Sequence, residues 1–399
     1  MIKNQLNPLP IVALCGFLGS GKTTLLRRWC RDETLKDAAM IIHDLSDFGL
    51  DAELISGEDV KPEKGSLNNR VAALHGEHAR AKLHSSVGTS LREISELDPA
   101  PSSVLCESTG AARPWPLIKA LTQNNLFYLR HFIVTVDALN LHRDFENGLV
   151  LISEAAPPQD PALNYAAEIL AEQIAFASVI VLTKVDTIPE KMVEEQVKNL
   201  QKLQPRAAVG LSGQAGLLLS NLESIPAPSL LKLAEQAKNL HVEEQVPTAE
   251  DVEPRLFSDP RPFHPERLHQ ACTKHLSTGV YRTKGYLWIA SRPKDVLLWQ
   301  QSGSQIALEL TGSWRAEVVH NTDGKLLPEE VEHLKAQLEK EHVTFGDRHN
   351  ELTVIGLKTA RDAFYLALQH ALCTDEEIDA WRRGESFSDP WPKSVKIID

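Results

Sequence analysis

The chain has 399 residues, of which 42% are hydrophobic, and a formal net charge of −12 at pH 7. This length accommodates two hydrophobic cores, because single domains usually contain roughly 100–200 residues. An acidic chain without a basic block is not expected to hold nucleic acid by its phosphates, and no apolar run reaches the ~18–20 residues of a membrane helix, so we expect neither nucleic acid nor a membrane as a partner.

The five cysteines lie far apart, and none belongs to a Cys-x-x-Cys pair. An odd number of cysteines at scattered, mostly apolar positions is typical of a reduced protein. The apolar run before residue 16 is short and lacks a cleavage pattern, so we expect no signal peptide and a cytoplasmic location.

Short apolar segments alternate with helical patterns through the first half of the chain. A strand is expected at 9–16, and a glycine-rich loop leads from it into a helix at 22–31. This alternation predicts an α/β domain over residues 1–225, in which helices cover a mostly parallel sheet. The other expected strands are 38–43, 104–108, 131–138 and 177–184.

The composition changes after residue 225. Residues 226–260 are rich in proline and charge, which predicts a linker, with a helix over 230–240 as an option within it. Residues 261–375 combine strand and helix patterns, which predicts a smaller α+β domain, and residues 376–399 are expected to form a tail. In the smaller domain, strands are expected at 280–290, 295–303, 305–314 and 351–358, and helices at 264–276, 327–342 and 359–374.

The glycine-rich loop reads GFLGSGKT and matches the pattern GxxxxGK[ST]. Glycines let consecutive backbone N–H groups surround a phosphate, while Lys22 can reach the outer phosphates and Thr23 can place its hydroxyl on Mg²⁺. A strand-to-helix turn that only requires glycine is the plain alternative, but the strand before the loop and the helix after it favour nucleotide binding. The expected nucleotide-binding residues here are Gly16, Gly19, Ser20, Gly21, Lys22, Thr23 and Thr24, with Lys22 also in a catalytic role.

A second motif, VLCESTG, ends the strand expected at 104–108. Glu107 at this strand end faces the ligand crevice of an α/β sheet, where its carboxylate can help Thr23 to hold Mg²⁺. Gly110 leaves room for a terminal phosphate to meet a backbone N–H. The alternative is a helix N-cap, with Ser108 or Thr109 starting the next helix.

A third motif, Thr183-Lys184-Val185-Asp186, ends the strand expected at 177–184. The Asp186 carboxylate can accept hydrogen bonds from both N1–H and the exocyclic amine of guanine, a donor pair that adenine lacks. The stem of Lys184 can lie along the base plane. These residues predict GTP rather than ATP, although the usual first residue of the motif is Asn and an ordinary β–α turn is the alternative.

These motifs together resemble those of the CobW-like GTPases, a P-loop family of metallochaperones and metal-insertion proteins that includes nitrile hydratase activators. The resemblance covers nearly the whole chain and continues in GVYRTKGYLWIA and FGDRHNELTVIGL of the smaller domain. It implies a P-loop NTPase domain followed by a CobW C-terminal-like α+β domain. It also implies a slow GTPase that uses GTP and Mg²⁺ to control the binding and delivery of a divalent metal, often zinc, to a client metalloprotein.

The chain departs from this family after the second expected strand. The family usually shows Asn-Glu-Phe-Gly-Glu there, whereas this chain reads HDLSDFGLD over 43–51. The segment keeps an acidic character, and we expect it to sense the terminal phosphate. Asp44 and Asp51 are the candidates for orienting the attacking water.

The larger departure is the loss of the family's Cys-x-Cys-Cys motif, because no cysteine lies between Cys30 and Cys106. The corresponding region offers His75, Glu77 and His78, and on a helix both histidines would share one face. Such imidazole and carboxylate donors suit Zn²⁺, Fe²⁺ or Co²⁺. A solvated helix face, with no metal site, is the alternative.

Three functions follow. The first is a GTP-hydrolysing metallochaperone or metalloenzyme activator with a client protein, as a monomer or a dimer. The second is a GTP-regulated protein-binding switch that has lost its internal metal site. The third, an ATP-using kinase on the same fold, is disfavoured by Asp186 and by the resemblance of the smaller domain.

Overall fold

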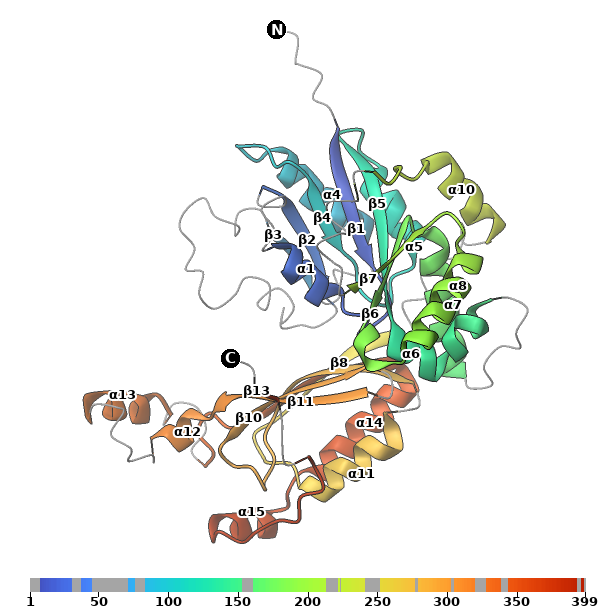
Figure 1. Ribbon diagram of the computed structural model, residues 1–399. Helices are drawn as coiled ribbons and strands as arrows, with labels where there is room; N and C mark the ends of the chain where they lie inside the picture. Colours follow the sequence, from blue (N-terminus) through green and yellow to red (C-terminus); the bar gives the residue numbers. More distant parts are fainter. Residues whose placement is uncertain are drawn as a thin grey trace. The chain divides into compact units, whose positions relative to one another are not determined.

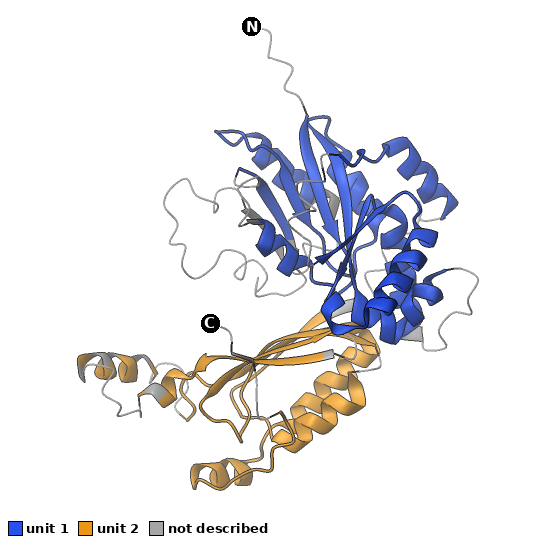
Figure 2. Cartoon of the chain, in the orientation of Figure 1, with its two compact units in different colours: residues 1–249 blue, residues 250–399 orange. Residues whose placement is uncertain are grey.

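A computed structural model of the chain describes residues 8–30, 37–44, 71–75, 83–152, 161–212, 222, 224–240, 252–276, 279–302, 305–319, 328–338, 344–392 and 396–397. The chain divides into two compact units, residues 1–249 and 250–399 (Figure 2). Each unit has its own sheet and its own hydrophobic core (Figure 1). Among the described helices, none is long and apolar enough to cross a membrane.

The first unit contains a sheet of seven described strands in the order β3-β2-β4-β1-β5-β6-β7, and every neighbouring pair is parallel. The predicted P-loop α/β fold is therefore confirmed. The sequence did not predict β3 or β7, because VAALH and AVGL are short and contain alanine or glycine, which have low strand propensity. The strands are β1 (Leu9–Cys15), β2 (Ala39–Asp44), β3 (Val71–His75), β4 (Val104–Glu107), β5 (Phe127–Asp137), β6 (Val179–Thr183) and β7 (Ala208–Leu211).

Helices lie on both faces of this sheet (Figure 1). The connection from β1 to β2 runs across the sheet in the opposite direction to those from β3 to β4 and from β4 to β5. Because parallel crossovers are right-handed, α1 (Lys22–Cys30) covers one face, while α4 (Leu83–Ser95) and α5 (Pro114–Thr122) cover the other. The α1 face buries Leu25, Leu26 and Trp29 against apolar side chains of β1 and β2. The remaining helices are α6 (Ala138–Asp144), η3 (Glu146–Leu151), α7 (Pro161–Phe176), η4 (Val185–Thr187), α8 (Glu190–Leu203) and α10 (Leu230–Asn239).

The strand register brings polar residues to one edge of the sheet. Parallel strands all present their carboxyl ends at the same edge, which is where ligands bind in such folds. Leu14 of β1 is the partner of Glu107 of β4, and Asp137 of β5 is the partner of Thr183 of β6. The glycine-rich loop follows β1 directly, so it begins between the end of β4, which carries Glu107, and the end of β5, which carries Asp137.

The second unit contains a sheet in the order β13-β11-β10-β9-β12-β8, antiparallel except for the pairing of β11 with β13. Helices α11 (Pro265–His275) and α14 (Lys358–Ala371) lie side by side (Figure 1) and pack with the strands around a core that includes Phe257, Trp299 and Phe364. The expected α+β architecture is thus present. The other elements are β8 (Val252–Asp259), β9 (Val280–Leu287), β10 (Asp295–Ser302), β11 (Gln305–Ser313), β12 (Asn350–Leu357), β13 (Lys396–Ile397), α12 (Arg315–Val318), α13 (Pro328–Leu338) and α15 (Asp375–Arg382).

The linker predicted over 226–260 differs from the structure at its carboxyl end. Residues 252–259 form β8, which pairs with β12 along its whole length. Pro254 lies inside this strand, and a proline is compatible with a strand only where no ladder hydrogen bond needs its missing N–H. β8 is an edge strand, which satisfies that condition. Pro254, which contributed to the linker prediction, therefore lies in an edge strand.

The tail predicted over 376–399 is also wrong for residues up to 392. Thr374 and Glu377 form a capping box at the start of α15. Asp389 accepts hydrogen bonds from Ser291 Oγ at 2.7 Å and from Arg292 Nε at 2.8 Å. Trp391 is 6% exposed within the core and donates from Nε1 to the carbonyl oxygen of Pro265 at 3.1 Å. This segment was misjudged because its partners lie about a hundred residues earlier.

We predict that Trp391→Ala lowers the free energy of unfolding of the second unit by about 3–5 kcal/mol, the usual effect of removing a buried aromatic side chain. Urea denaturation followed by circular dichroism measures this change. Ser388→Ala, at an exposed position in the same segment, is the control and should change stability by less than about 0.5 kcal/mol. An equal midpoint for Trp391→Ala and the wild type would show that the segment is a dispensable tail.

Candidate functional site

The loop between β1 and α1 requires glycine at its first position. Gly16 has a φ of +142°, and a Cβ there would lie 2.4 Å from the carbonyl oxygen of Thr135 on β5. The loop backbone is therefore pressed against the end of β5, where no side chain fits. Gly19 and Gly21 also have positive φ, which allows the loop to turn tightly before α1 begins.

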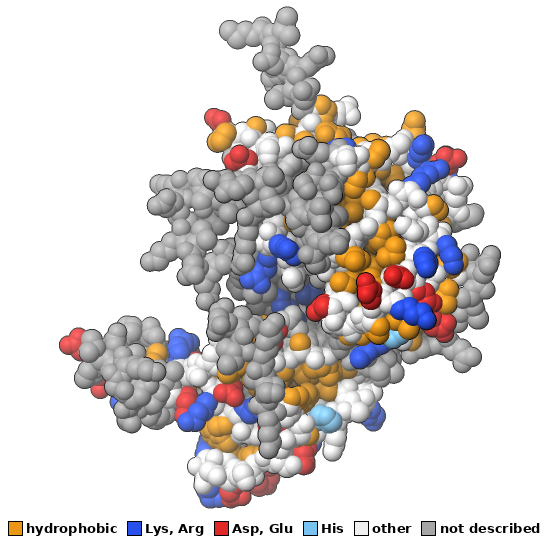
Figure 3. All heavy atoms as spheres, in the orientation of Figure 1, with side chains coloured by type: hydrophobic (Ala, Val, Ile, Leu, Met, Phe, Trp, Pro, Cys, Tyr) orange, Lys and Arg blue, Asp and Glu red, His pale blue; other side chains and the backbone are white. Residues whose placement is uncertain are grey.

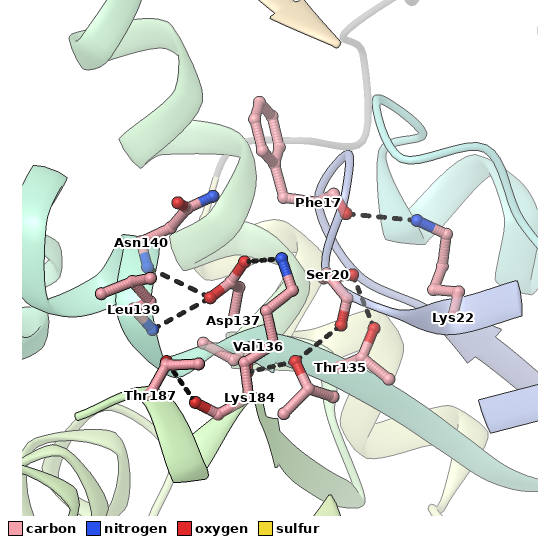
Figure 4. Close-up of polar contacts among 11 residues, drawn as sticks. Phe17, Ser20, Lys22, Thr135, Val136, Asp137, Leu139, Asn140, Lys184 and Thr187 are labelled. Carbon is pink, nitrogen blue, oxygen red and sulfur yellow. Dashed lines mark hydrogen bonds and ion pairs between the residues drawn. The ribbon is translucent and has the colours of Figure 1, made fainter. Parts of the chain in front are cut away.

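Lys22 lies inside the curve of this loop. Its Nζ donates hydrogen bonds to the carbonyl oxygens of Gly16 at 2.7 Å and of Phe17 at 3.2 Å, the second of which is drawn in Figure 4. The residue is only 5% exposed, so the loop holds a buried ammonium group. A positive charge surrounded by a glycine-rich turn at a helix N-terminus is suited to bind an anion.

Hydroxyl groups from two other strands form hydrogen bonds with the loop (Figure 4). Ser20 Oγ lies 2.7 Å from Thr135 Oγ1 of β5, and Thr183 Oγ1 of β6 donates to the Ser20 carbonyl oxygen at 2.8 Å. Both contacts are buried. Thr183, which stands where such motifs usually have Asn, thus connects the third motif directly to the first.

The Thr23 hydroxyl points at the end of β4. Its Oγ1 donates to Glu107 Oε1 at 2.8 Å, and Glu107 is 3% exposed. The two oxygen groups that the sequence assigns to Mg²⁺ are therefore in contact, and hard oxygen donors are what this ion prefers. The alternative that Ser108 or Thr109 caps a helix is wrong, because α5 begins at Pro114 with Arg113 as its N-cap. Thr24, the third residue of α1, is exposed.

The segment after Glu107 is held between the loop and α7. A Cβ on Gly110 would lie 2.6 Å from the backbone nitrogen of Leu18, so this glycine touches the loop backbone. Gln173 of α7, fully buried, donates from Nε2 to the carbonyl oxygens of Gly110 at 3.2 Å and Ala112 at 3.0 Å. Arg113 forms an ion pair with Glu172 of the same helix.

The third motif follows β6 along the same edge. Lys184 adopts a left-handed conformation with φ 54°, and its Nζ lies 2.5 Å from Asp137 Oδ2 at the end of β5 (Figure 4). Asp186 follows in η4 and is exposed. Thr135 and Asp137 were not predicted from the sequence. The signal that could have found them is two polar residues at the end of the apolar run FIVTVDA.

Two further candidates, Asp44 and His75, end neighbouring strands of the same sheet. Asp44 ends β2 and His75 ends β3, and the two residues are register partners on neighbouring parallel strands. His75 is therefore in a strand and not on the helix that would give it a common face with His78, because the apolar run before it pairs with buried β2. Asp51, Glu77 and His78 lie outside the described residues.

Thiol ligands do not replace the missing cysteine motif in the described part of the chain. Cys15 and Cys106 are buried free thiols, and burial raises the pKa of Cys106 to about 12, which keeps it protonated. Metal binding needs the thiolate form. The described residues contain no group of three or more His, Cys, Asp or Glu side chains that could hold a metal ion.

Figure 3 shows acidic and basic side chains of the described residues mixed on one face of the first unit. Neither sign forms a continuous patch on that face.

Comparison with known proteins gives two matching family profiles. The CobW/HypB/UreG nucleotide-binding domain matches residues 10–210, and the C-terminal domain of the cobalamin synthesis protein cobW matches residues 253–372. The chain is 26% identical to zinc-regulated GTPase metalloprotein activator 1 of Dictyostelium discoideum, over 94% of this chain and 82% of that protein. It is 24% identical to the zinc chaperone CobW of Pseudomonas aeruginosa, over 81% and 88% of the two chains. A solved structure, Zn(II)-bound YjiA GTPase from E. coli, matches 92% of this chain and 100% of that chain, with 19% identity and a TM-score of 0.36.

We predict that Gly110→Ala weakens nucleotide triphosphate binding by about tenfold or more, because its methyl group would meet the Leu18 backbone at 2.6 Å and displace the loop. Isothermal titration with a non-hydrolysable triphosphate measures the effect. Gly88→Ala is the matched control, since a Cβ at Gly88 in α4 meets nothing within 4 Å. Equal affinities for Gly110→Ala and Gly88→Ala would contradict the close approach of residue 110 to the loop.

Proposed function

We propose that this chain hydrolyses GTP and that its nucleotide state controls the binding and release of a divalent metal ion for a client protein. The proposal starts from its family, because the chain belongs to the CobW/HypB/UreG family of nucleotide-binding proteins. The proposed nucleotide binding rests on the contact between the third motif and the glycine-rich loop. The Thr183 hydroxyl bonds the Ser20 carbonyl at 2.8 Å, so the segment expected to select the base adjoins the loop expected to hold the phosphates.

The groups assigned to the phosphate side are suited to bind a triphosphate. Lys22 supplies a buried positive charge, and the N–H groups of the loop and of Gly110 supply donors. Thr23 and Glu107 are the residues that would hold Mg²⁺, which when bound neutralises charge on the phosphates. We assign Asp44 and Asp51 the role of orienting the attacking water. Hydrolysis is expected to be slow until a partner orders that water.

The base side supports guanine rather than adenine. The exposed carboxylate of Asp186 is the acceptor we assign to N1–H and the exocyclic amine of guanine. The stem of Lys184 is the apolar surface along which the base would lie. Thr183 takes the place of the usual Asn, and its bond to Ser20 supports a bracing role.

The metal part of the proposal rests on the relatives and on the residues that replace their cysteines. Two of the relatives are named as a zinc chaperone and a zinc-regulated GTPase metalloprotein activator. We propose His75, Glu77 and His78 as ligands for Zn²⁺, or for Fe²⁺ or Co²⁺, as the transported ion. The register of β2 and β3 places His75 beside Asp44 of the nucleotide-sensing segment, which supports coupling between metal and nucleotide. The client is a metalloprotein of the cytoplasm.

One observation favours a second function. The chain has no cysteine between Cys30 and Cys106, so the thiolate site of the family is gone. The alternative is a GTP-regulated switch that binds a client protein and carries no metal itself. The P-loop, Glu107 and Asp186 fit both functions equally.

Metal competition separates these functions. We predict that the purified protein takes Zn²⁺ from a chromophoric chelator with an affinity that differs at least about tenfold between the GTP-analogue and GDP states. We expect this difference because the metal ion and the nucleotide would both bind at the segment that follows β2, so that binding of one changes the affinity for the other. His75→Ala/His78→Ala should lose the tight site.

His370→Ala, an exposed histidine of α14, is the control and should retain the tight site. Absence of a tight site in all nucleotide states would contradict metal transport and favour the switch. A tight site that survives in the double variant would remove His75 and His78 from the ligand set.

A further inference from the structure

The carboxylate of Asp137 is held by hydrogen bonds on both of its oxygens beside the proposed base site. Its side chain is 4% exposed, although it lies at the end of β5 next to a loop region. One oxygen, Oδ1, accepts hydrogen bonds from the backbone N–H groups of Leu139 at 2.9 Å and Asn140 at 3.1 Å, which caps α6. The other, Oδ2, lies 2.5 Å from Lys184 Nζ. The two oxygens therefore have separate tasks (Figure 4).

We propose that Asp137 is a positioning residue for the nucleotide base, which acts by fixing the side chain of Lys184. This inference rests on the proposed function, since it assumes that Lys184 and Asp186 form a guanine site. Asp137 itself does not touch the base in this scheme. It holds the ammonium group so that the apolar stem between Cα and Nζ spans the end of β6 in one conformation.

The ion pair determines which part of the Lys184 side chain is suited to contact a nucleotide. A lysine with an unoccupied ammonium group in a phosphate-binding protein would be expected to bind phosphate. Here the ammonium is committed to a buried carboxylate, so the part left for the ligand is the alkyl stem. A methylene surface suits the face of a purine base rather than a phosphate.

The ion pair with Asp137 also orders the side chain of Lys184 before the ligand binds. A free lysine side chain has four rotatable bonds, and ordering it on binding opposes affinity. Lys184 is held at both ends. Its carbonyl oxygen accepts from Thr187 Oγ1 at 2.6 Å, and its Nζ is paired with Asp137. The two ends fix the left-handed backbone and the direction of the side chain.

Asp137→Asn separates the two tasks of the carboxylate. Asn is as good an N-cap as Asp, because its side-chain oxygen accepts the same backbone hydrogen bonds. Its amide group carries no charge and cannot form the ion pair with Lys184. The variant should keep the thermal unfolding midpoint of the wild type and lose only the restraint on the lysine.

The test compares two ligands, GTP and inorganic tripolyphosphate, both with Mg²⁺. Tripolyphosphate reports on the phosphate side alone, because it has no base. We expect Asp137→Asn to weaken GTP binding by about tenfold, the scale of one hydrogen bond to a charged group, and to change tripolyphosphate binding by less than about twofold. Unchanged GTP affinity, or equal losses for both ligands, would overturn the inference.

A double-variant cycle tests whether Asp137 acts through Lys184. Lys184→Met keeps an apolar stem but has no ammonium, so adding Asp137→Asn to it should cause no further loss of GTP affinity. Independent, multiplying losses would overturn the inference. Asp144→Asn, the same chemical change at the end of α6, is the control and should bind GTP like the wild type.

The same data separate failure of this inference from failure of the proposed function. A wild-type protein that binds GTP no more tightly than tripolyphosphate has no base site, and the proposed guanine site fails with the inference. A wild-type protein that clearly prefers GTP, with Asp137→Asn unaffected, refutes the positioning role alone.

Discussion

The close approach of the glycine-rich loop to the end of β5 is the constraint on which the candidate site depends. A Cβ at residue 16 would lie 2.4 Å from the Thr135 carbonyl oxygen, so only glycine at this position allows the loop to pack there. This packing allows Ser20 to bond Thr135 and allows Thr183 to reach the Ser20 carbonyl. The glycine-rich loop and the third motif, which are about 160 residues apart in the chain, then form one hydrogen-bonded unit.

Contacts at the same edge of the sheet connect the glycine-rich loop to α7, so a bound nucleotide could change the position of that helix. Gly110 touches the loop, and its carbonyl oxygen is held by Gln173 of α7. Arg113 is paired with Glu172 of that helix, and burial raises the pKa of this carboxyl group despite the opposing effect of the arginine. A terminal phosphate that moved Gly110 would therefore also have to move or break contacts with α7. Changes of this kind are how nucleotide switches pass a local event to a docking surface.

The sequence predicted the features that depend on local patterns. The strands near residues 9–16, 104–108 and 177–184, the glycine-rich loop and the smaller α+β domain are all present. The errors involve partners that are far away in the chain. The spacing of His75 and His78 suggested a shared helix face, whereas the pairing of β2 with β3 puts His75 in a strand. Trp391 and Asp137 were not predicted, because their partners Pro265 and Lys184 cannot be identified from neighbouring residues.

The central claim is that this edge of the sheet binds GTP through Asp186, and base selectivity tests it most directly. The measurement is the ratio of affinities for GTP and xanthosine triphosphate in the wild type and in Asp186→Asn. The wild type should prefer GTP, and the variant should prefer the xanthine nucleotide, because an amide pairs with a base that carries a carbonyl in place of the exocyclic amine. An unchanged ratio in the variant would remove Asp186 from the base site, and no triphosphate binding in the wild type would contradict the whole account.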